Sequence, residues 1–258
     1  MTARDPLAEL KPQLLATKSE IARRFALAGQ QIEDPAPRPK FWQFLGEAEV
    51  FAEVLNRPMR KIPIAQAKNP RTVMVLPGFM THPVRMRFMT QHLDRAGHHT
   101  KRWGQGFNFG PTEENFAQLE ERLLGLYEQA GEPIVLLGWS LGGVFARELA
   151  KKQPHAVAKV ITMGSPFSGD PRSNNVWRVY QLVTGHQVDN PPVVEDVAAK
   201  PPVETVAMWS PRDGMIAPRA ACGMAHERDR AIALRCTHIG FSYSKEAIVA
   251  VLEELERG

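Results

Sequence analysis

The segment Gly138-Trp139-Ser140-Leu141-Gly142 has residue types and a spacing that suit a serine acting as a nucleophile. It follows a short apolar run at residues 134–137 and precedes a stretch with helical spacing, 142–153. A serine in a tight strand-to-helix turn has strained backbone angles, and glycines two residues away on either side prevent a collision. The turn lifts the hydroxyl above the sheet edge, over the positive end of the next helix. We predict that Ser140 is a nucleophile; the alternative is a glycine-rich turn whose serine has no chemical role.

A serine hydroxyl is a weak nucleophile and needs a base that an acid orients. Of the eight histidines, we favour His238, because it follows the last expected strand, where the chain turns at the carboxyl edge of the sheet. His186 lies in an insertion, and His226 lies in a polar stretch with helical character, residues 217–230. The other five precede Ser140 or follow it closely and are out of order: His82, His92, His98, His99 and His155.

The acid is expected in the loop after the preceding strand. The segment 209–216 follows the expected strand and offers Asp213 in a turn, 25 residues before His238. Glu195 and Asp196 are rivals, but both precede that strand. An Asp-Gly pair is also common in simple turns, so a purely local role for Asp213 is the alternative.

The negative oxygen of a tetrahedral intermediate requires preorganised backbone N–H donors. The amide of Leu141, directly after the serine, is one candidate. The other is expected from the loop after the first strong strand, Leu76-Pro77-Gly78-Phe79-Met80. Gly78 permits close backbone approach, and we favour the amide of Phe79 over that of Met80. The Pro-Gly pair is equally compatible with an ordinary turn.

The elements around these residues alternate between short apolar strands and helices. This alternation predicts an α/β fold with a mostly parallel central sheet and helices on both faces. Expected strands lie at 72–76, 99–103, 134–137, 157–163, 203–209 and 232–236, and expected helices at 84–96, 113–130, 142–153 and 244–256.

Two regions fall outside this alternation. Residues 1–70 form a helical N-terminal arm, with helices at 5–32 and 41–56 around a proline-rich linker at 34–39, and residues 71–258 form the main domain. The arm either packs on that domain or forms a homodimer surface. An insertion at about 168–202 carries apolar residues at helical spacing, Trp177 and Tyr180 among them. We interpret it as a cap over a substrate pocket; the alternative is that it only covers an exposed core edge.

Composition restricts the class of protein further. The chain has 258 residues, 43% hydrophobic and 23% charged, as in ordinary globular proteins. The net charge of +4 is mild, and short basic runs such as Arg23-Arg24 fit solvated helix faces, so nucleic-acid binding is not indicated. Cys222 and Cys236 fit free thiols better than a disulfide, and no metal-ligand spacing is present. Without a signal peptide or membrane span in the sequence, the expected location is cytoplasmic.

These segments together resemble the α/β-hydrolase superfamily, and within it bacterial lipase- and esterase-like proteins. The likeness covers about 72–256 and rests on five segments in the expected order: Leu-Pro-Gly-Phe at 76–79, Gly-Trp-Ser-Leu-Gly-Gly at 138–143, Gly-Ser-Pro-Phe at 164–167, Ser-Pro-Arg-Asp-Gly-Met-Ile at 210–216 and Thr-His-Ile-Gly at 237–240. The loop after residue 78 lacks the His-Gly pair that often precedes the oxyanion residue, which leaves the substrate class open.

The resemblance implies a catalytic triad of Ser140, Asp213 and His238 with Phe79 and Leu141 as oxyanion donors. It also implies hydrolysis of a small or lipid-like carboxylic ester through an acyl-enzyme, with no metal or organic cofactor. An acyltransferase, an interfacial lipase or a non-catalytic binding protein on the same fold are the alternatives.

Overall fold

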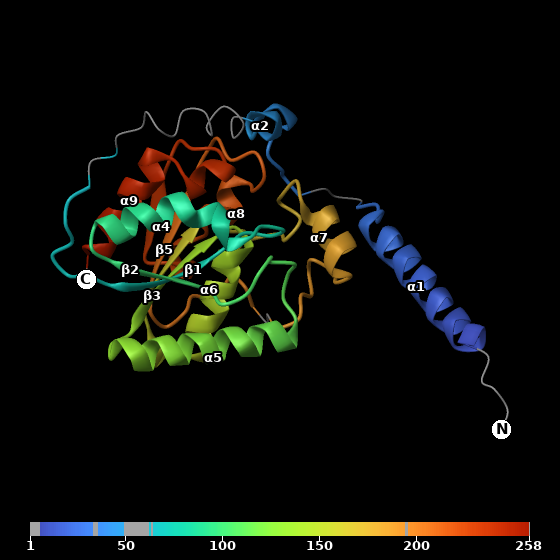
Figure 1. Ribbon diagram of the computed structural model, residues 1–258. Coiled ribbons are helices and arrows are strands. Elements are labelled where there is room, and N and C mark those ends of the chain that lie inside the picture. The colour runs from blue at the N-terminus through green and yellow to red at the C-terminus, as the bar shows by residue number, and fades with distance from the viewer. Residues whose placement is uncertain (1–5, 33–35, 49–61, 63, 194–195, 258) are drawn as a thin grey trace, which may run out of the picture.

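The computed structural model describes residues 6–32, 36–48, 62, 64–193 and 196–257 (Figure 1). They contain one six-stranded sheet in which every neighbouring pair is parallel, in the order β2-β1-β3-β4-β5-β6. The strands are β1 (Thr72–Leu76), β2 (His99–Arg102), β3 (Ile134–Trp139), β4 (Val157–Met163), β5 (Glu204–Trp209) and β6 (Arg230–Ala233). The predicted parallel α/β architecture is confirmed.

Helices cover both faces of the sheet, which explains why its central strands are apolar at successive positions. On one face, Val73 and Val75 of β1 pack with α4 (Arg87–Arg95) and α9 (Lys245–Leu255). On the other, Met74 and Leu76 pack with α5 (Glu113–Ala130) and α6 (Leu141–Lys152). Figure 1 shows α4 and α9 above the sheet and α5 below it.

The remaining α-helices in the described part of the chain are α1 (Pro6–Ala28), α2 (Phe41–Gly46), α7 (Trp177–Thr184) and α8 (Pro218–Cys222). Single 3-10 turns are η2 (Pro83–Met86), η3 (Pro154–Ala156), η4 (Ala225–Glu227) and η5 (Ile239–Ser242). The expected helix at 41–56 begins as α2, and residues 49–56 lie outside the described part of the chain.

Two sequence predictions near the carboxyl end are wrong in detail. The helical stretch expected at 217–230 is two short pieces, α8 and η4, because Gly223 between them has a φ of 67°. The last strand begins two residues early and ends at Ala233 instead of 236. The chain then leaves the sheet, and the carbonyl of Cys236 accepts a hydrogen bond from the Ser210 hydroxyl at 2.6 Å. The loop that carries His238 is therefore held against the end of β5.

The helix α1 packs along the cap helix α7 and extends beyond it (Figure 1). Arg24 Nη1 donates to the carbonyl of Val183 at 2.6 Å, and Arg23 Nη2 donates to that of Gly185 at 3.0 Å. These carbonyls lie at the C-terminal end of α7, where helices leave acceptors unsatisfied. Arg23 is exposed, as a solvated face predicts, but Arg24 is half-buried and both side chains also cap another helix, which the sequence did not predict.

Candidate active site

The carboxyl ends of four strands bring the predicted residues to one edge of the sheet. Phe79 follows β1, Ser140 follows β3, Asp213 follows β5 and His238 follows β6. Because all the strands are parallel, these ends meet on the same side. The strand order reverses between β1 and β3, and ligands of open α/β sheets bind at such a switch point.

Ser140 lies in a strained turn between β3 and α6. Its φ of 54° and ψ of −125° are far from the helical values that begin at Leu141. A Cβ atom on Gly138 would lie 2.4 Å from the Gly142 carbonyl oxygen, and one on Gly142 would lie 2.3 Å from that of Leu76. Both glycines of the motif are therefore required by close backbone packing, as the sequence predicts.

His238 and Asp213 form a buried hydrogen-bonded pair. Nδ1 of His238 lies 2.8 Å from Oδ2 of Asp213, and their side chains are 3% and 1% exposed. The other carboxylate oxygen, Oδ1, accepts from the amides of Met215 and Ile216, each at 2.8 Å. A carboxylate only accepts, so Nδ1 carries the proton and Nε2 is left as the basic nitrogen.

The electrostatic environment of His238 favours its protonated form. Burial lowers the pKa of the imidazole, but the charge of Asp213, its hydrogen bond to Nδ1 and the charge of Glu47 raise it further, so the pKa of His238 lies above its ordinary value of 6.5. A base of this kind accepts a proton from a serine readily and holds it near neutral pH.

The residue before Ser140 connects the serine turn to the loop of His238. Trp139 Nε1 donates to the carbonyl of His238 at 3.0 Å, and the two ring centroids are 5.7 Å apart. Among the described residues, no hydrogen bond joins the Ser140 hydroxyl to His238. Such bonds are often loose in hydrolases without substrate and tighten when the reacting complex forms.

The loop after β1 has the geometry of an oxyanion loop. Gly78 approaches the serine so closely that a Cβ there would lie 3.1 Å from Ser140 Cβ. The amide of Met80 donates to the carbonyl of Asn108 at 2.7 Å, and the Asn108 side chain donates to the carbonyl of Pro77 at 2.8 Å. The backbone amide of Met80 is thus already used in a hydrogen bond. Within the described ranges, the amides of Phe79 and Leu141 have no acceptor.

Gly164, at the end of β4, is a site residue that sequence reasoning did not single out. It has a φ of 56°, and a Cβ there would lie 3.0 Å from Asp213 Oδ2 and 3.1 Å from His238 Nδ1. A side chain at this position would push Asp213 and His238 apart. The signal in the sequence was the Gly164-Ser165-Pro166-Phe167 turn after an apolar strand.

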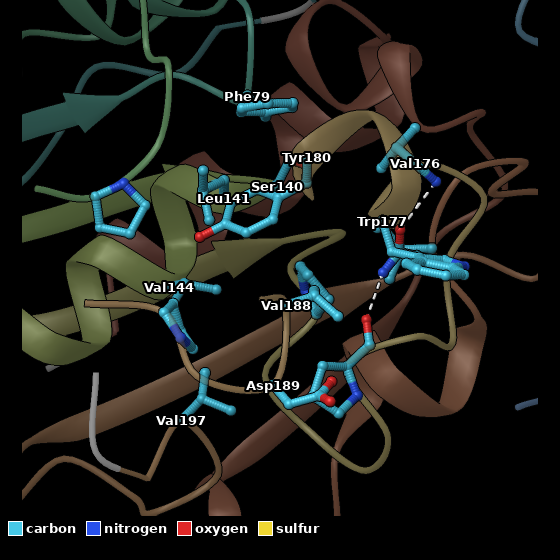
Figure 2. Close-up of a pocket in the computed structure, with 16 residues that line it drawn as sticks. Phe79, Ser140, Leu141, Val144, Val176, Trp177, Tyr180, Val188, Asp189 and Val197 are labelled. Carbon is cyan, nitrogen blue, oxygen red and sulfur yellow. Dashed lines mark hydrogen bonds between the residues drawn. The ribbon is translucent and has the colours of Figure 1, made fainter. Parts of the chain in front are cut away.

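A pocket of about 130 Å³ opens on Ser140 (Figure 2). Most of its lining is apolar and comes from three places: Phe79 in the loop after β1, Leu141 and Val144 on α6, and the insertion that contains α7. In Figure 2 the pocket extends from Phe79 at the top to Asp189 and Val197 at the bottom.

The two residues expected in the cap both line this pocket. Trp177 and Tyr180 lie on α7 and are 1% and 8% exposed. The Tyr180 ring packs on that of Phe79, with centroids 5.4 Å apart. The guanidinium groups of Arg172 and Arg178 lie over the Trp177 ring at 5.8 and 4.2 Å, and Arg172 also pairs with Asp189 at the far end. Tyr180 thus joins the cap to the loop after β1, and the charged contacts around Trp177 and Asp189 are made within the cap itself.

A buried carboxylate from the arm also reaches the site. Glu47, which is 5% exposed, accepts backbone hydrogen bonds beside both Asp213 and His238. The sequence offered no signal for it. Of the rival acids, Asp196 accepts from the amides of Ala198 and Ala199 instead, and Glu195 lies outside the described residues.

Comparisons with known proteins agree with this fold. Residues 74–189 match the family model described as the alpha/beta hydrolase fold. A monoacylglycerol lipase from Paleococcus ferrophilus is similar in structure, with a TM-score of 0.52 and 16% identity over 76% of this chain and 99% of the lipase. One of the metagenome-derived lipolytic enzymes LipS and LipT has a TM-score of 0.55 and 17% identity, over 76% of this chain and 97% of that enzyme. Polyneuridine aldehyde esterase has a TM-score of 0.50 and 13% identity, over 72% of this chain and 99% of the esterase. No curated protein sequence matches the chain.

The chain has the α/β-hydrolase fold, as the family match over residues 74–189 and the parallel sheet together show. Its structural neighbours include lipases and esterases at low identity. In the part of the chain that the structure describes, no helix is long and apolar enough to cross a membrane. The same residues hold no cluster of three side chains suited to a metal ion, and both cysteines are free thiols, Cys236 buried and Cys222 half-buried.

Proposed function

We propose that the protein is a serine hydrolase that cleaves carboxylic esters through an acyl-enzyme. The observation that carries this proposal is the buried His238–Asp213 pair, bonded at 2.8 Å, at the same sheet edge as the strained Ser140 turn. A buried histidine with a fixed tautomer serves as a base, and a serine in a strained turn presents its hydroxyl to substrate.

The reaction proceeds in two halves. Ser140 Oγ attacks the ester carbonyl while Nε2 of His238 takes the hydroxyl proton, and the amides of Phe79 and Leu141 stabilise the negative oxygen. The imidazolium, stabilised by Asp213, then gives the proton to the departing alcohol oxygen and leaves an acyl-serine ester. A water molecule attacks this ester, loses its proton to His238, and the proton returns to Ser140 as the carboxylic acid leaves.

The lining of the pocket supports an apolar acyl group as the substrate part that binds there. Phe79, Val144 and Trp177 offer apolar surface, and burying each methylene of an acyl chain contributes about 0.8 kcal/mol. The size of the pocket, about 130 Å³, favours a short or medium chain within it.

A series of nitrophenyl esters from acetyl to palmitoyl tests this proposal. The purified protein is expected to hydrolyse the shorter members, and Ser140→Ala to lose at least about a thousandfold in kcat. Ser244→Ala, which removes a serine that caps α9, is a matched control expected to keep turnover. Turnover that survives in Ser140→Ala would contradict the proposal.

A further inference from the structure

The segment 36–48 of the arm packs directly on the loop that carries the acid. A Cβ on Gly214 would lie 2.3 Å from the carbonyl oxygen of Gln43 and 2.7 Å from Phe44 Cα, so the two backbones are in close contact. The Gln43 side chain donates to the carbonyl of Pro211 at 2.7 Å. Asn175, in the cap insertion, donates to the carbonyls of Pro39 and Gly214 at 3.1 and 2.8 Å.

Glu47, just after α2, joins the acid loop to the base loop. Its Oε1 accepts from the amide of Gly214 at 2.9 Å and from that of His238 at 2.8 Å, and its Oε2 accepts from that of Ile239 at 2.8 Å. Gly214 directly follows Asp213. The amides of His238 and Ile239 open η5, where helical turns leave donors unsatisfied and favour a negative charge.

From this geometry we infer that Glu47 is a positioning residue of the active site: one buried carboxylate holds the loops of Asp213 and His238 at the spacing that their hydrogen bond needs. The inference rests on the proposed function, because it assigns Glu47 a role through the acid and the base. Glu47 does not touch the reacting atoms. The arm thereby completes the catalytic machinery of the main domain.

The energetics of burial support this role over a passive one. A buried carboxylate is costly unless charge-assisted hydrogen bonds compensate it, and Glu47 receives three from backbone amides. Replacing the charge leaves those amides with a weaker acceptor or none. Without this shared acceptor the two loops are expected to move apart by small amounts, to which a catalytic hydrogen bond is sensitive.

Glu47 also acts on His238 through its charge. Two charged groups face the imidazole, Asp213 from the loop after β5 and Glu47 from the arm, and the rings packed against it belong to Trp139 and Phe241, which are uncharged. Both carboxylates raise the pKa of His238 against the lowering effect of its burial. Removal of the Glu47 charge therefore lowers the pKa of His238.

The test compares Glu47→Gln with Glu20→Gln, the same chemical change at an exposed carboxylate of the arm. In Glu47→Gln, kcat for a nitrophenyl ester is expected to fall about tenfold with KM within about twofold, and the rise of kcat/KM with pH is expected to shift to lower pH. Glu20→Gln should match the wild type in both. A Glu47→Gln enzyme with wild-type kcat, or with a pH profile that does not move, would overturn the inference.

A second readout needs no turnover and separates this inference from the proposed function. The imidazole of His238 is titrated by NMR in a Ser140→Ala background, with and without Glu47→Gln. The midpoint should fall to lower pH when the carboxylate is removed, and an unchanged midpoint refutes the role of Glu47 whatever the enzyme hydrolyses. If Ser140→Ala alone retains turnover, the proposed function fails while the NMR result still judges Glu47.

A third variant covers the case in which Glu47→Gln does not fold, as judged by circular dichroism. Glu47→Asp keeps the charge and shortens the side chain by one methylene. The titration midpoint of His238 should therefore stay close to that of the wild type, while turnover falls. A Glu47→Asp enzyme with full turnover would show that the three backbone bonds do not position the loops.

Discussion

The indole nitrogen of Trp139 donates to the backbone carbonyl of His238 at 3.0 Å, so the residue next to Ser140 holds the loop of His238. Trp139→Phe removes this bond and keeps most of the ring packing. One such bond contributes about 1 kcal/mol, and we expect kcat to fall about fivefold.

A second tryptophan provides the control for that substitution. Trp103 is also buried, and its indole donates to the carbonyl of Gln105 at 2.7 Å. It lies in the core cluster that includes α5, remote from the predicted triad. Trp103→Phe should lower the free energy of unfolding to an extent similar to Trp139→Phe and leave kcat unchanged. Equal losses of kcat in both variants would assign the effect to general stability.

The acid is tested by Asp213→Asn. The asparagine oxygen can still accept from the amides of Met215 and Ile216, so the loop is expected to keep its shape. Its NH₂ group would then face Nδ1 of His238, which must accept, and the ring proton moves to Nε2, where no proton can be taken from Ser140. We expect a loss of kcat of about ten thousandfold near neutral pH with an unchanged circular dichroism spectrum. Nearly full turnover in Asp213→Asn would show that another group orients His238.

The raised pKa of His238 predicts the pH dependence of the reaction. Burial lowers this pKa, but the charge and hydrogen bond of Asp213 and the charge of Glu47 outweigh it. The base must be neutral, so kcat/KM should rise through a single ionisation whose midpoint lies above the ordinary histidine value of 6.5. A midpoint at or below that value would contradict the assignment of His238.

The same shift has a consequence for stability. A pKa that is higher in the folded than in the unfolded state means that protonation of His238 stabilises the folded protein. This contribution is fully present below the unfolded-state pKa and is lost as the pH rises through the folded-state pKa. In His238→Ala the free energy of unfolding should no longer show this dependence over that window when it is measured by urea titration at several pH values.

The cap predicts a change of specificity. Trp177 and Tyr180 line the pocket that opens on Ser140, whereas Val179 on the same helix is 44% exposed. Trp177→Ala and Tyr180→Ala enlarge the pocket, so the preference among acetyl, butyryl and octanoyl esters should shift towards longer chains. Val179→Ala should leave it unchanged. If all three variants keep the relative rates of the wild type for these esters, Trp177 and Tyr180 do not belong to the substrate site.

Local sequence context was enough to predict the parts of the site that depend on a turn. The glycines around Ser140, the strand before it and the chain order of Asp213 and His238 are short-range signals, because each loop follows directly from a strand end. The alternating apolar strands likewise predicted a sheet buried on both faces.

Contacts between distant segments could not be predicted in this way. Glu47 lies 191 residues from His238, and a single glutamate in a helical pattern looks like a solvated residue. The pair Arg23-Arg24 has the same pattern whether it faces water or the end of α7. Both cases depend on where the arm packs, which the sequence left open between the main domain and a dimer surface.

Labelling with a fluorophosphonate probe, followed by mass spectrometry of the peptides, tests the central claim most directly. The probe forms a covalent bond only with a serine that a base has activated. We expect one probe per chain on Ser140, no labelling of Ser140→Ala and much slower labelling of His238→Ala. A folded protein that stays unlabelled, or that is labelled at another residue, would contradict the assignment of Ser140 as the nucleophile.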